Sequence, residues 1–254
     1  MKTLLDTWLI FVRAMRLNLR FPVWIFIGVT QPILYLALFG PLLANTIPLP
    51  PGASTSFAWL IFVPGLLVQL ALFGAGNSGF GIVFEYLEGV IERMRVTPAS
   101  RLALLLGRVG VSVTTLLVQS VILLIISIPF GFDPDWAGVA MLMVLIAILG
   151  AALSAISNAL GLVLKDVGSL ASVINGVMVP LLLLSGILLP MSLAPAWLYN
   201  ISRLNPLTYV VNASRDLVVG EYTTSATITG FAVAIGLAIV AFWWGSRTFK
   251  TQNA

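Results

Sequence analysis

Long apolar stretches recur along the chain, and each is about as long as the 20 or so residues that a helix needs to cross a bilayer. Prolines, glycines and acidic residues interrupt the pattern, for example at residues 48–52 and 133–135. Six apolar windows result, at residues 22–44, 57–81, 104–130, 137–163, 168–190 and 226–246. The pattern predicts an all-α membrane protein with six transmembrane helices, forming a single domain over residues 1–254.

The composition supports this prediction and narrows the possible chemistry. Hydrophobic residues make up 59% of the chain and charged residues 9%, and the mean hydropathy is +1.07. A soluble domain of this size could not bury so much apolar surface. The chain has no cysteine and no histidine, so it lacks the commonest metal ligand and general base as well as thiol chemistry. We expect no metal site and no catalytic residue on it.

The basic residues divide unequally between the two sides of the predicted bundle. Eleven of the 13 fall on the side of the termini: Lys2, Arg13, Arg16, Arg20, Arg93, Arg95, Arg101, Arg108, Lys165, Arg247 and Lys250. Only Arg203 and Arg215 fall on the other side. Because cytoplasmic loops are enriched in lysine and arginine, both termini are predicted to be cytoplasmic. The net charge of +4 therefore indicates topology, and no nucleic-acid partner is expected.

Residues 1–21 are predicted to form an amphipathic helix. Its charged residues, including Arg13 and Arg16, share one side, while Trp8 and Phe11 lie on the opposite side. Such a helix lies in the membrane surface, with its arginines toward lipid headgroups. It could serve as a topological anchor alone, or it could also support a cytoplasmic partner.

The most highly charged run covers residues 82–101. Glu85, Glu88 and Glu92 have the spacing i, i+3, i+7, so on a helix they share one face. The helix is expected to end before Pro98, and the second span is expected to continue into it without a turn. A charged face of this kind is usually only solvated. Three like charges on one stripe repel each other, however, which favours a docking element below the membrane.

Residues 185–216 form an apolar segment that is broken by Pro190, Pro195 and Pro206 and contains both remaining arginines. Irregular backbone at membrane depth is tolerated only where protein or a water-filled cavity shelters it. The segment is therefore predicted to be a sheltered, broken helix on the outer side.

Polar residues within the spans are few, and those of interest are Gln31, Gln69, Gln119, Ser154, Asn158 and Asn175. Such side chains commonly hydrogen-bond neighbouring helices. The alternative is that Gln69, Gln119, Ser154, Asn158 and Asn175 line a substrate path.

The two irregular segments together resemble the membrane subunit of type-2 ABC exporters, nearest to the drug-resistance type. The first matches the family pattern E-x-x-x-G-T-L-E-R-L-x-V-T-P-x-S-R at Glu85, Gly89, Glu92, Arg93, Val96, Thr97, Pro98, Ser100 and Arg101. The second resembles S-G-x-x-F-P-x-x-x-L-P-x-W-L followed by N-P-L-T-Y and an arginine. It matches at Ser185, Gly186, Pro190, Pro195, Trp197, Leu198, Asn205, Pro206, Leu207, Thr208, Tyr209 and Arg215.

The resemblance implies roles for both segments. Residues 82–101 would be the coupling helix that contacts an ABC ATPase subunit, through Glu85, Glu88, Glu92, Arg93, Arg95, Thr97 and Pro98. Residues 185–216 would be a re-entrant helical hairpin whose outer gate comprises Ser185, Gly186, Pro190, Pro195, Trp197, Asn205, Pro206 and Arg215. The implied assembly has two ATPase copies and two permease chains, identical or related, in a bacterial or archaeal cytoplasmic membrane. The chain contains no Walker A pattern, so ATP and Mg²⁺ are expected on the ATPase and no cofactor on this chain.

An apolar or amphipathic cargo, drug-like or lipid-like, fits spans that carry no charged residue well inside them. An exporter of polysaccharide or of a lipid-linked glycan is the alternative within the family. A membrane-embedded enzyme is a rival from another class, but it would need convergent acids, a metal cluster or an activated nucleophile. An autonomous channel or secondary transporter would usually show intramembrane charge or two related halves.

Overall fold

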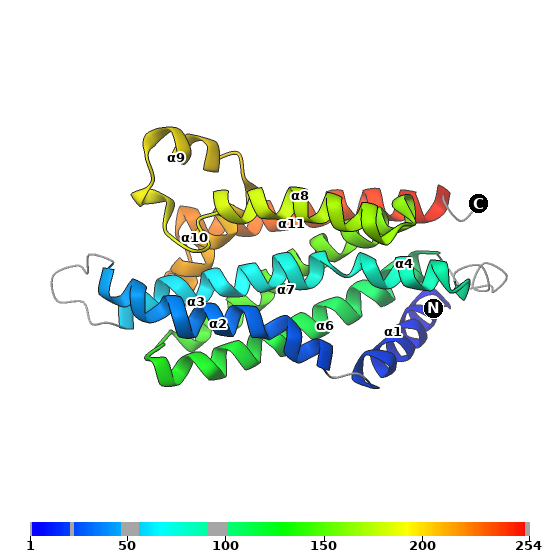
Figure 1. Ribbon diagram of the computed structural model, residues 1–254, viewed down its shortest axis with the longest axis horizontal. Helices are drawn as coiled ribbons and strands as arrows, with labels where there is room; N and C mark the ends of the chain where they lie inside the picture. Colours follow the sequence, from blue (N-terminus) through cyan, green and yellow to red (C-terminus); the bar gives the residue numbers. More distant parts are fainter. Residues whose placement is uncertain (1, 21–22, 47–55, 91–100, 252–254) are drawn as a thin grey trace.

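Long helices make up most of the structure, a computed structural model that describes residues 2–20, 23–46, 56–90 and 101–251 (Figure 1). The α-helices are α1 (Lys2–Arg20), α2 (Val23–Thr46), α3 (Ser56–Leu70), α4 (Gly79–Leu87), α6 (Arg101–Ser127), α7 (Trp136–Leu164), α8 (Val167–Leu184), α9 (Ala196–Ser202), α10 (Pro206–Val218) and α11 (Ser225–Thr251). A π-helix, η1 (Ala71–Ala75), and two 3₁₀ helices, η2 (Ile128–Phe130) and η3 (Met191–Leu193), complete the elements. The described residues contain no strand.

Six helical segments are long and apolar enough to cross a membrane, which confirms the predicted all-α fold with six spans. They are Ile25–Leu42, Phe57–Leu87, Leu102–Phe130, Trp136–Leu164, Val167–Leu184 and Ser225–Phe249. The fifth ends earlier than its apolar window, because the chain turns at Ser185 and Gly186. The Ser185 hydroxyl donates to the Leu182 carbonyl oxygen at 2.7 Å, and Gly186 has a φ of 77°, which favours glycine.

The second span does not continue without a turn, so that prediction is wrong. The π-helix η1 leads into a turn at Asn77 and Ser78 before α4 begins. A second turn follows α4 at Glu88 and Gly89, where Gly89 has a φ of 70°. Glycine adopts this left-handed conformation without steric strain, so it readily ends a helix. The helix that carries Glu85 therefore does not extend unbroken through residues 82–101.

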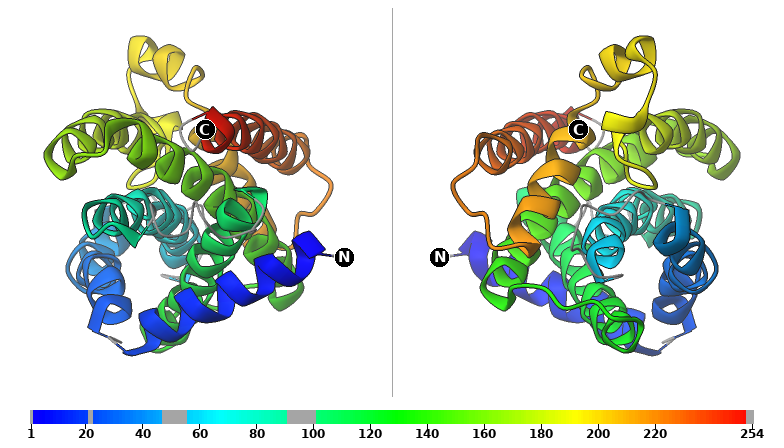
Figure 2. Two further views of the ribbon diagram at one scale, coloured as in Figure 1. Left: turned by 90° about the vertical axis from the view of Figure 1, so that its right-hand side faces the viewer. Right: turned by 90° about the vertical axis from the view of Figure 1, so that its left-hand side faces the viewer.

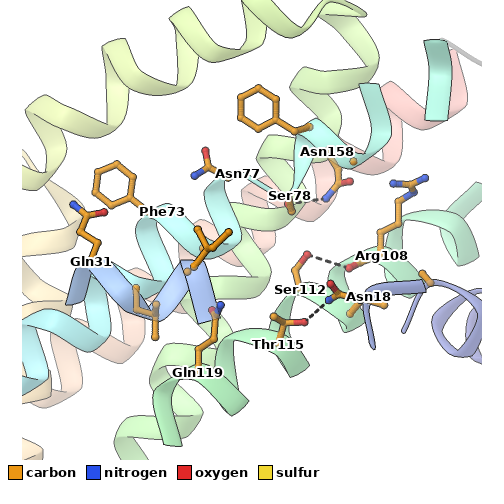
Figure 3. Close-up of a pocket in the computed structure, with 18 of the residues that line it drawn as sticks. Asn18, Gln31, Phe73, Asn77, Ser78, Arg108, Ser112, Thr115, Gln119 and Asn158 are labelled. Carbon is orange, nitrogen blue, oxygen red and sulfur yellow. Dashed lines mark hydrogen bonds between the residues drawn. The ribbon is translucent and has the colours of Figure 1, made fainter. Parts of the chain in front are cut away.

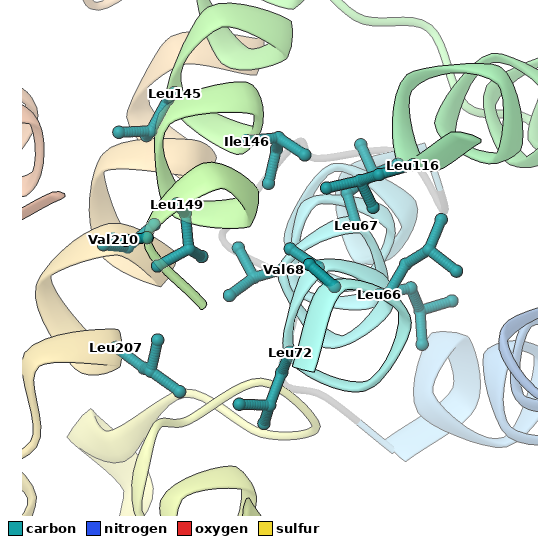
Figure 4. Packing of buried hydrophobic residues seen from close by; sticks show 14 of the residues in the cluster. Leu66, Leu67, Val68, Leu72, Leu116, Leu145, Ile146, Leu149, Leu207 and Val210 are labelled. Carbon is teal, nitrogen blue, oxygen red and sulfur yellow. The ribbon is translucent and has the colours of Figure 1, made fainter. Parts of the chain in front are cut away.

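The bundle is built around the second and fourth spans. Helix α7 packs against α4, α6, α10 and α11, and leucine, isoleucine and valine side chains fill the space between the helices (Figure 4). Leu67, Leu116 and Leu149 are fully buried there. In the second span 72% of the apolar window is buried, whereas in α8 only 17% is. The exposed apolar face of α8 is suited to lipid or to another protein surface rather than to water.

The two termini lie at the same end of the bundle (Figure 1). Helix α1 runs across this end (Figure 2) and packs along α6, where Ile10 and Phe11 contact the α6 glycines Gly107 and Gly110. Leu4 and Trp8 are exposed. At the opposite end, which we call the distal end, α9 projects away from the other helices (Figure 1).

Candidate functional site

Side chains of α7 bind the backbone at the break in the second span. The Ser157 hydroxyl donates to the Gly76 carbonyl oxygen and accepts a hydrogen bond from the Gly79 amide at 2.9 Å. Ser157 is 3% exposed. An unpaired backbone group at membrane depth is costly, so this one hydroxyl stabilises the broken helix on both sides of its turn.

The turn residue Ser78 extends this contact. The hydroxyl oxygens of Ser78 and Ser154 are 3.0 Å apart, and the Asn158 side-chain amide donates to the Ser78 hydroxyl at 3.0 Å. Asn158 also donates to the Ser154 carbonyl oxygen at 2.8 Å. We call Ser78, Ser154, Ser157 and Asn158 the α4–α7 polar contact. Ser154 and Asn158, predicted as path residues, therefore both hold α4 against α7.

A cavity of about 950 Å³ opens beside the break in the second span (Figure 3). Its wall comes from α1, α2, α6 and the part of the broken span between Gln69 and Phe84, with one residue each from α7 and α8. Seven carboxamide side chains line it: Asn18, Gln31, Gln69, Asn77, Gln119, Asn158 and Asn175. Gln31, Asn77 and Asn175 are exposed, whereas Gln69, Gln119 and Asn158 are buried. The cavity therefore reaches from the surface of the bundle into its interior.

Four of the five predicted path residues, Gln69, Gln119, Asn158 and Asn175, line this one cavity. They differ in their partners. Gln119 donates to the Ile25 carbonyl oxygen at 3.0 Å and so ties α6 to α2, and Asn175 donates to Ala171 within its own helix at 2.9 Å. Neither amide atom of Gln69 has a partner. Sequence reasoning missed the aromatic part of the wall, formed by Phe73, Phe80 and Phe84, since apolar residues are unremarkable in a membrane span.

An ion pair includes Arg108, the charged residue among those that line the cavity. Arg108 of α6 forms a salt bridge with Glu85 of α4, and the two side chains are 14% and 29% exposed. Glu85 was predicted to contact an ATPase, whereas Arg108 was considered only as one of the basic residues that indicate topology. Glu88 is exposed after the end of α4. The other predicted coupling residues, Glu92, Arg93, Arg95, Thr97 and Pro98, lie outside the described residues.

The predicted gate residues lie at the distal end, where prolines begin the short helices. Pro190 precedes η3, Pro195 precedes α9 and Pro206 is the first residue of α10, a position that suits proline because its missing amide hydrogen has no intrahelical partner there. Trp197 on α9 is 64% exposed. The prolines thus start new helices rather than kink an existing one.

Polar side chains of α10 bind the carboxyl end of α8. The Asn205 side chain caps α10 by accepting from the Leu207 amide at 3.0 Å, and its NH₂ group donates to the Leu181 carbonyl oxygen at 2.7 Å. The Thr208 hydroxyl is within hydrogen-bond distance of the Leu184 carbonyl oxygen, at 3.1 Å. The last carbonyl groups of a helix lack hydrogen-bond partners within that helix. Asn205 and Thr208 provide such partners for two of these carbonyl groups at the end of α8.

Arg215 completes this group, which we call the distal polar cluster and define as Asn205, Thr208 and Arg215. Its Nε donates to the Ile61 carbonyl oxygen of α3 at 3.0 Å, and a terminal guanidinium nitrogen donates to the Gly186 carbonyl oxygen at 2.7 Å. The arginine thereby joins α10 to α3 and to the turn after α8. Ser185 and Gly186, both predicted as gate residues, form that turn.

Asp135 caps α7 near the distal cluster. Its carboxylate accepts from the Gly138 amide at 2.7 Å and from the Tyr222 hydroxyl. These hydrogen bonds, chiefly the one from Tyr222, hold the pKa of Asp135 below its ordinary value. The charged carboxylate stabilises the fold fully when the pH is above the ordinary carboxyl pKa of about 3.9. This stabilisation is lost as the pH falls through the lower pKa of the native state.

We therefore expect Tyr222→Phe to lower the melting temperature by an amount that depends on pH. The difference from the unmodified protein should be constant between about pH 5 and 7 and shrink below about pH 4, where Asp135 becomes protonated. Thermal unfolding in lipid nanodiscs at each pH measures this difference in melting temperature. Tyr199→Phe, at an exposed tyrosine of α9, is the control and should show no such dependence. A difference that stayed constant to pH 3 would contradict the role of the charged carboxylate.

Comparison with known proteins gives a consistent set of similarities. A family model described as ABC-2 type transporter matches residues 6–219. The daunorubicin resistance ABC transporter permease protein DrrB1 of Streptomyces coeruleorubidus is 26% identical over 246 residues, covering 95% of this chain and 85% of that protein. A protein named as a transport permease, ycf38, of Cyanophora paradoxa is 30% identical over 200 residues, which cover 78% of this chain and 69% of that protein. The inner membrane transport permease YadH of Escherichia coli K12 is 29% identical over 218 residues, which cover 83% of this chain and 80% of that protein.

Proposed function

We propose that this chain, which belongs to the ABC-2 type transporter family, moves a hydrophobic or amphipathic compound, drug-like or lipid-like, out of the cell. In general class, the chain is a multi-pass membrane permease of an ABC exporter of the drug-resistance type. Permeases of this family work with an ABC ATPase. We take that ATPase to be a separate subunit, which binds ATP and Mg²⁺, while this chain provides the path.

The cavity beside the broken second span is the observation that carries this proposal. Its volume of about 950 Å³ falls in the range of sites that bind drug-sized molecules. Phenylalanine side chains form one part of its wall and uncharged amides another. A compound with both apolar and hydrogen-bonding parts is complementary to such a wall, and a relative named for daunorubicin resistance supports the same class of cargo.

The proposed assembly contains two permease chains, identical or related, and two ATPase subunits. Both termini, α1 and the segment that follows α4 face the cytoplasm of a bacterial or archaeal cell, with α1 in the membrane surface. The exposed side chains of Leu4 and Trp8 support an interfacial position for α1, because such side chains favour the headgroup and acyl boundary. The distal end then faces outward.

In the proposed cycle, closure of the ATPase subunits displaces the coupling segment and with it α4. The π-helix and the turn at Asn77 and Ser78 separate α4 from α3, so α4 can tilt while α3 stays fixed in the core. Such a discrete break lets a small displacement change the shape of the adjoining cavity. At the other end, residues 185–216 act as the outer gate, which the distal polar cluster holds in place.

Glu92→Lys tests the coupling step. We expect it to abolish ATP-dependent transport, since it reverses a charge on the predicted docking face, while the amount of protein in the membrane stays unchanged. The assay is uptake of a fluorescent amphiphile into inverted vesicles that contain the permease and its ABC ATPase partner. Glu221→Lys, an exposed glutamate at the distal end, is the matched control and should transport normally. Normal uptake by the Glu92 variant would contradict the coupling role.

A further inference from the structure

Asn77 carries an amide that a molecule in the cavity can reach. The residue is exposed and lines the cavity at the turn between η1 and α4 (Figure 3). The other exposed amides of the wall have partners, since Gln31 donates to the Tyr35 hydroxyl at 3.4 Å and Asn175 donates to the Ala171 carbonyl oxygen at 2.9 Å. No hydrogen bond joins the Asn77 side chain to another described residue. Its donors and its acceptor are therefore available to a ligand.

The backbone around Asn77 is fixed from the side of α7. The Gly76 carbonyl oxygen accepts from the Ser157 hydroxyl, and the Ser78 hydroxyl accepts from the Asn158 amide at 3.0 Å. The residues before and after Asn77 are thus held against α7, while Asn77 itself lines the cavity. A binding group that is already held in place loses little conformational freedom when a ligand binds.

Aromatic side chains flank this amide along the second span. Phe73, Asn77, Phe80 and Phe84 have the spacing i, i+4, i+7, i+11, which is typical of residues on one face of a helix. All four line the cavity, so they remain on one side despite the break. An amide flanked by phenyl rings suits a molecule that carries a polar group on an apolar body. The amide both donates and accepts hydrogen bonds, and phenyl faces attract cations, so neutral and cationic groups both fit.

The depth of Asn77 indicates that water surrounds it when no cargo is bound. Asn77 lies within the span Phe57–Leu87, where lipid chains would leave an exposed amide without a hydrogen-bond partner, at a cost in free energy. Ala14 and Asn18 of α1 line the same cavity, and α1 is the helix that we place in the membrane surface. The cavity therefore connects the depth of Asn77 with the level of the headgroups, where water is present.

We infer that Asn77 is a cargo-binding residue in a water-filled cavity. A polar group of the cargo replaces water at the Asn77 amide, and the apolar body of the cargo lies against Phe73 and Phe80. This inference rests on the proposed function, because it takes the cavity to be the cargo path. It adds a binding residue that the sequence pattern did not single out. It also places the cargo in contact with the turn about which α4 is proposed to tilt.

The first test asks whether water reaches Asn77. The chain contains no cysteine, so Asn77→Cys carries a single thiol. Ile239→Cys, at a 65% exposed position of α11 outside the cavity, is the matched control within another span. In nanodiscs we expect Asn77→Cys to react with trimethylammonium-ethyl methanethiosulfonate at least about tenfold faster, because the reactive thiolate forms only in contact with water. Equal rates would overturn the inference, since lipid or a second chain would then cover Asn77.

The second test measures binding of a nitrobenzoxadiazole-labelled dodecanamide to the full chain in nanodiscs by fluorescence, with the signal of empty nanodiscs subtracted. Asn77→Leu should weaken binding about tenfold, the loss expected for two neutral hydrogen bonds. Asn77→Gln keeps the amide and should retain most of the affinity. Asn212→Leu, at an exposed amide of α10 outside the cavity, should leave the affinity unchanged.

The outcomes of the binding test separate this inference from the proposed function. If the dodecanamide binds and Asn77→Leu leaves its affinity unchanged, Asn77 is not a cargo-binding residue, while the proposed function stands. If the dodecanamide does not bind to the unmodified chain, the cavity is not the cargo path, and the role proposed for the cavity is overturned together with this inference.

Discussion

Replacing Arg108 with methionine is expected to destabilise the protein by about 2 kcal/mol, because it leaves the Glu85 carboxylate without its partner. Both side chains are mostly buried, so water replaces the lost ion pair only in part. The effect should appear as a lower melting temperature in nanodiscs and a lower amount of protein in the membrane.

Combining Arg108→Met with Glu85→Gln should recover most of the loss, since a neutral amide can remain unpaired at much lower cost than a carboxylate. Arg203→Met, at an exposed arginine at the distal end, is the control and should change stability by less than about 0.5 kcal/mol. If the double variant were as unstable as Arg108→Met alone, the cause would be lost packing of the arginine rather than the unpaired charge.

Replacing Gly79 with alanine is expected to destabilise the protein by about 2 kcal/mol, the cost of overpacking a tight contact. A methyl group at this position would collide with the carbonyl oxygen of Ser157. Helix α4 would have to move away from α7, which also disturbs the hydrogen bond between the Gly79 amide and the Ser157 hydroxyl. Thermal unfolding in nanodiscs measures the loss, and transport should fall with it because the α4–α7 polar contact is displaced.

Gly81→Ala is the matched control, two residues further along the same helix. Nothing lies within 4 Å of the added methyl group there, so the higher helix propensity of alanine should raise stability by up to about 1 kcal/mol. The two substitutions are expected to change stability in opposite directions only if α4 and α7 are in backbone contact at Gly79. Equal effects would contradict that contact.

The spans could be predicted from the sequence because the bilayer imposes their length. Each predicted window lies on a helical span, although the second covers α3, η1 and the start of α4. The first begins at residue 22, one residue before Val23 of α2. The fifth differs at its end, since residues 185–190 are as apolar as the helix before them. What ends α8 is the hydroxyl of Ser185 together with the left-handed backbone of Gly186. Hydropathy does not record either feature.

The site could be predicted only in part. Polarity within the spans identified Gln69, Gln119, Asn158 and Asn175 as exceptional, and the structure places all four around one cavity. Their partners could not be predicted, because hydrogen bonds such as the one between Asn158 and Ser78 depend on which helices cross and at what height. The ion pair of Glu85 and Arg108 was missed for the same reason. Each residue had a plausible role within its own segment, while the pairing requires α4 and α6 to be neighbours.

The distal polar cluster has a consequence for biosynthesis. Arg215 binds the carbonyl oxygen of Ile61, 154 residues earlier in the chain, and Asn205 binds that of Leu181. Ribosomes deliver α3 to the membrane long before α10 is synthesised, so the Ile61 carbonyl oxygen must wait for a side chain that is made 154 residues later. A nascent chain cut short before α10 would therefore leave the Ile61 and Leu181 carbonyl oxygens without these side-chain partners.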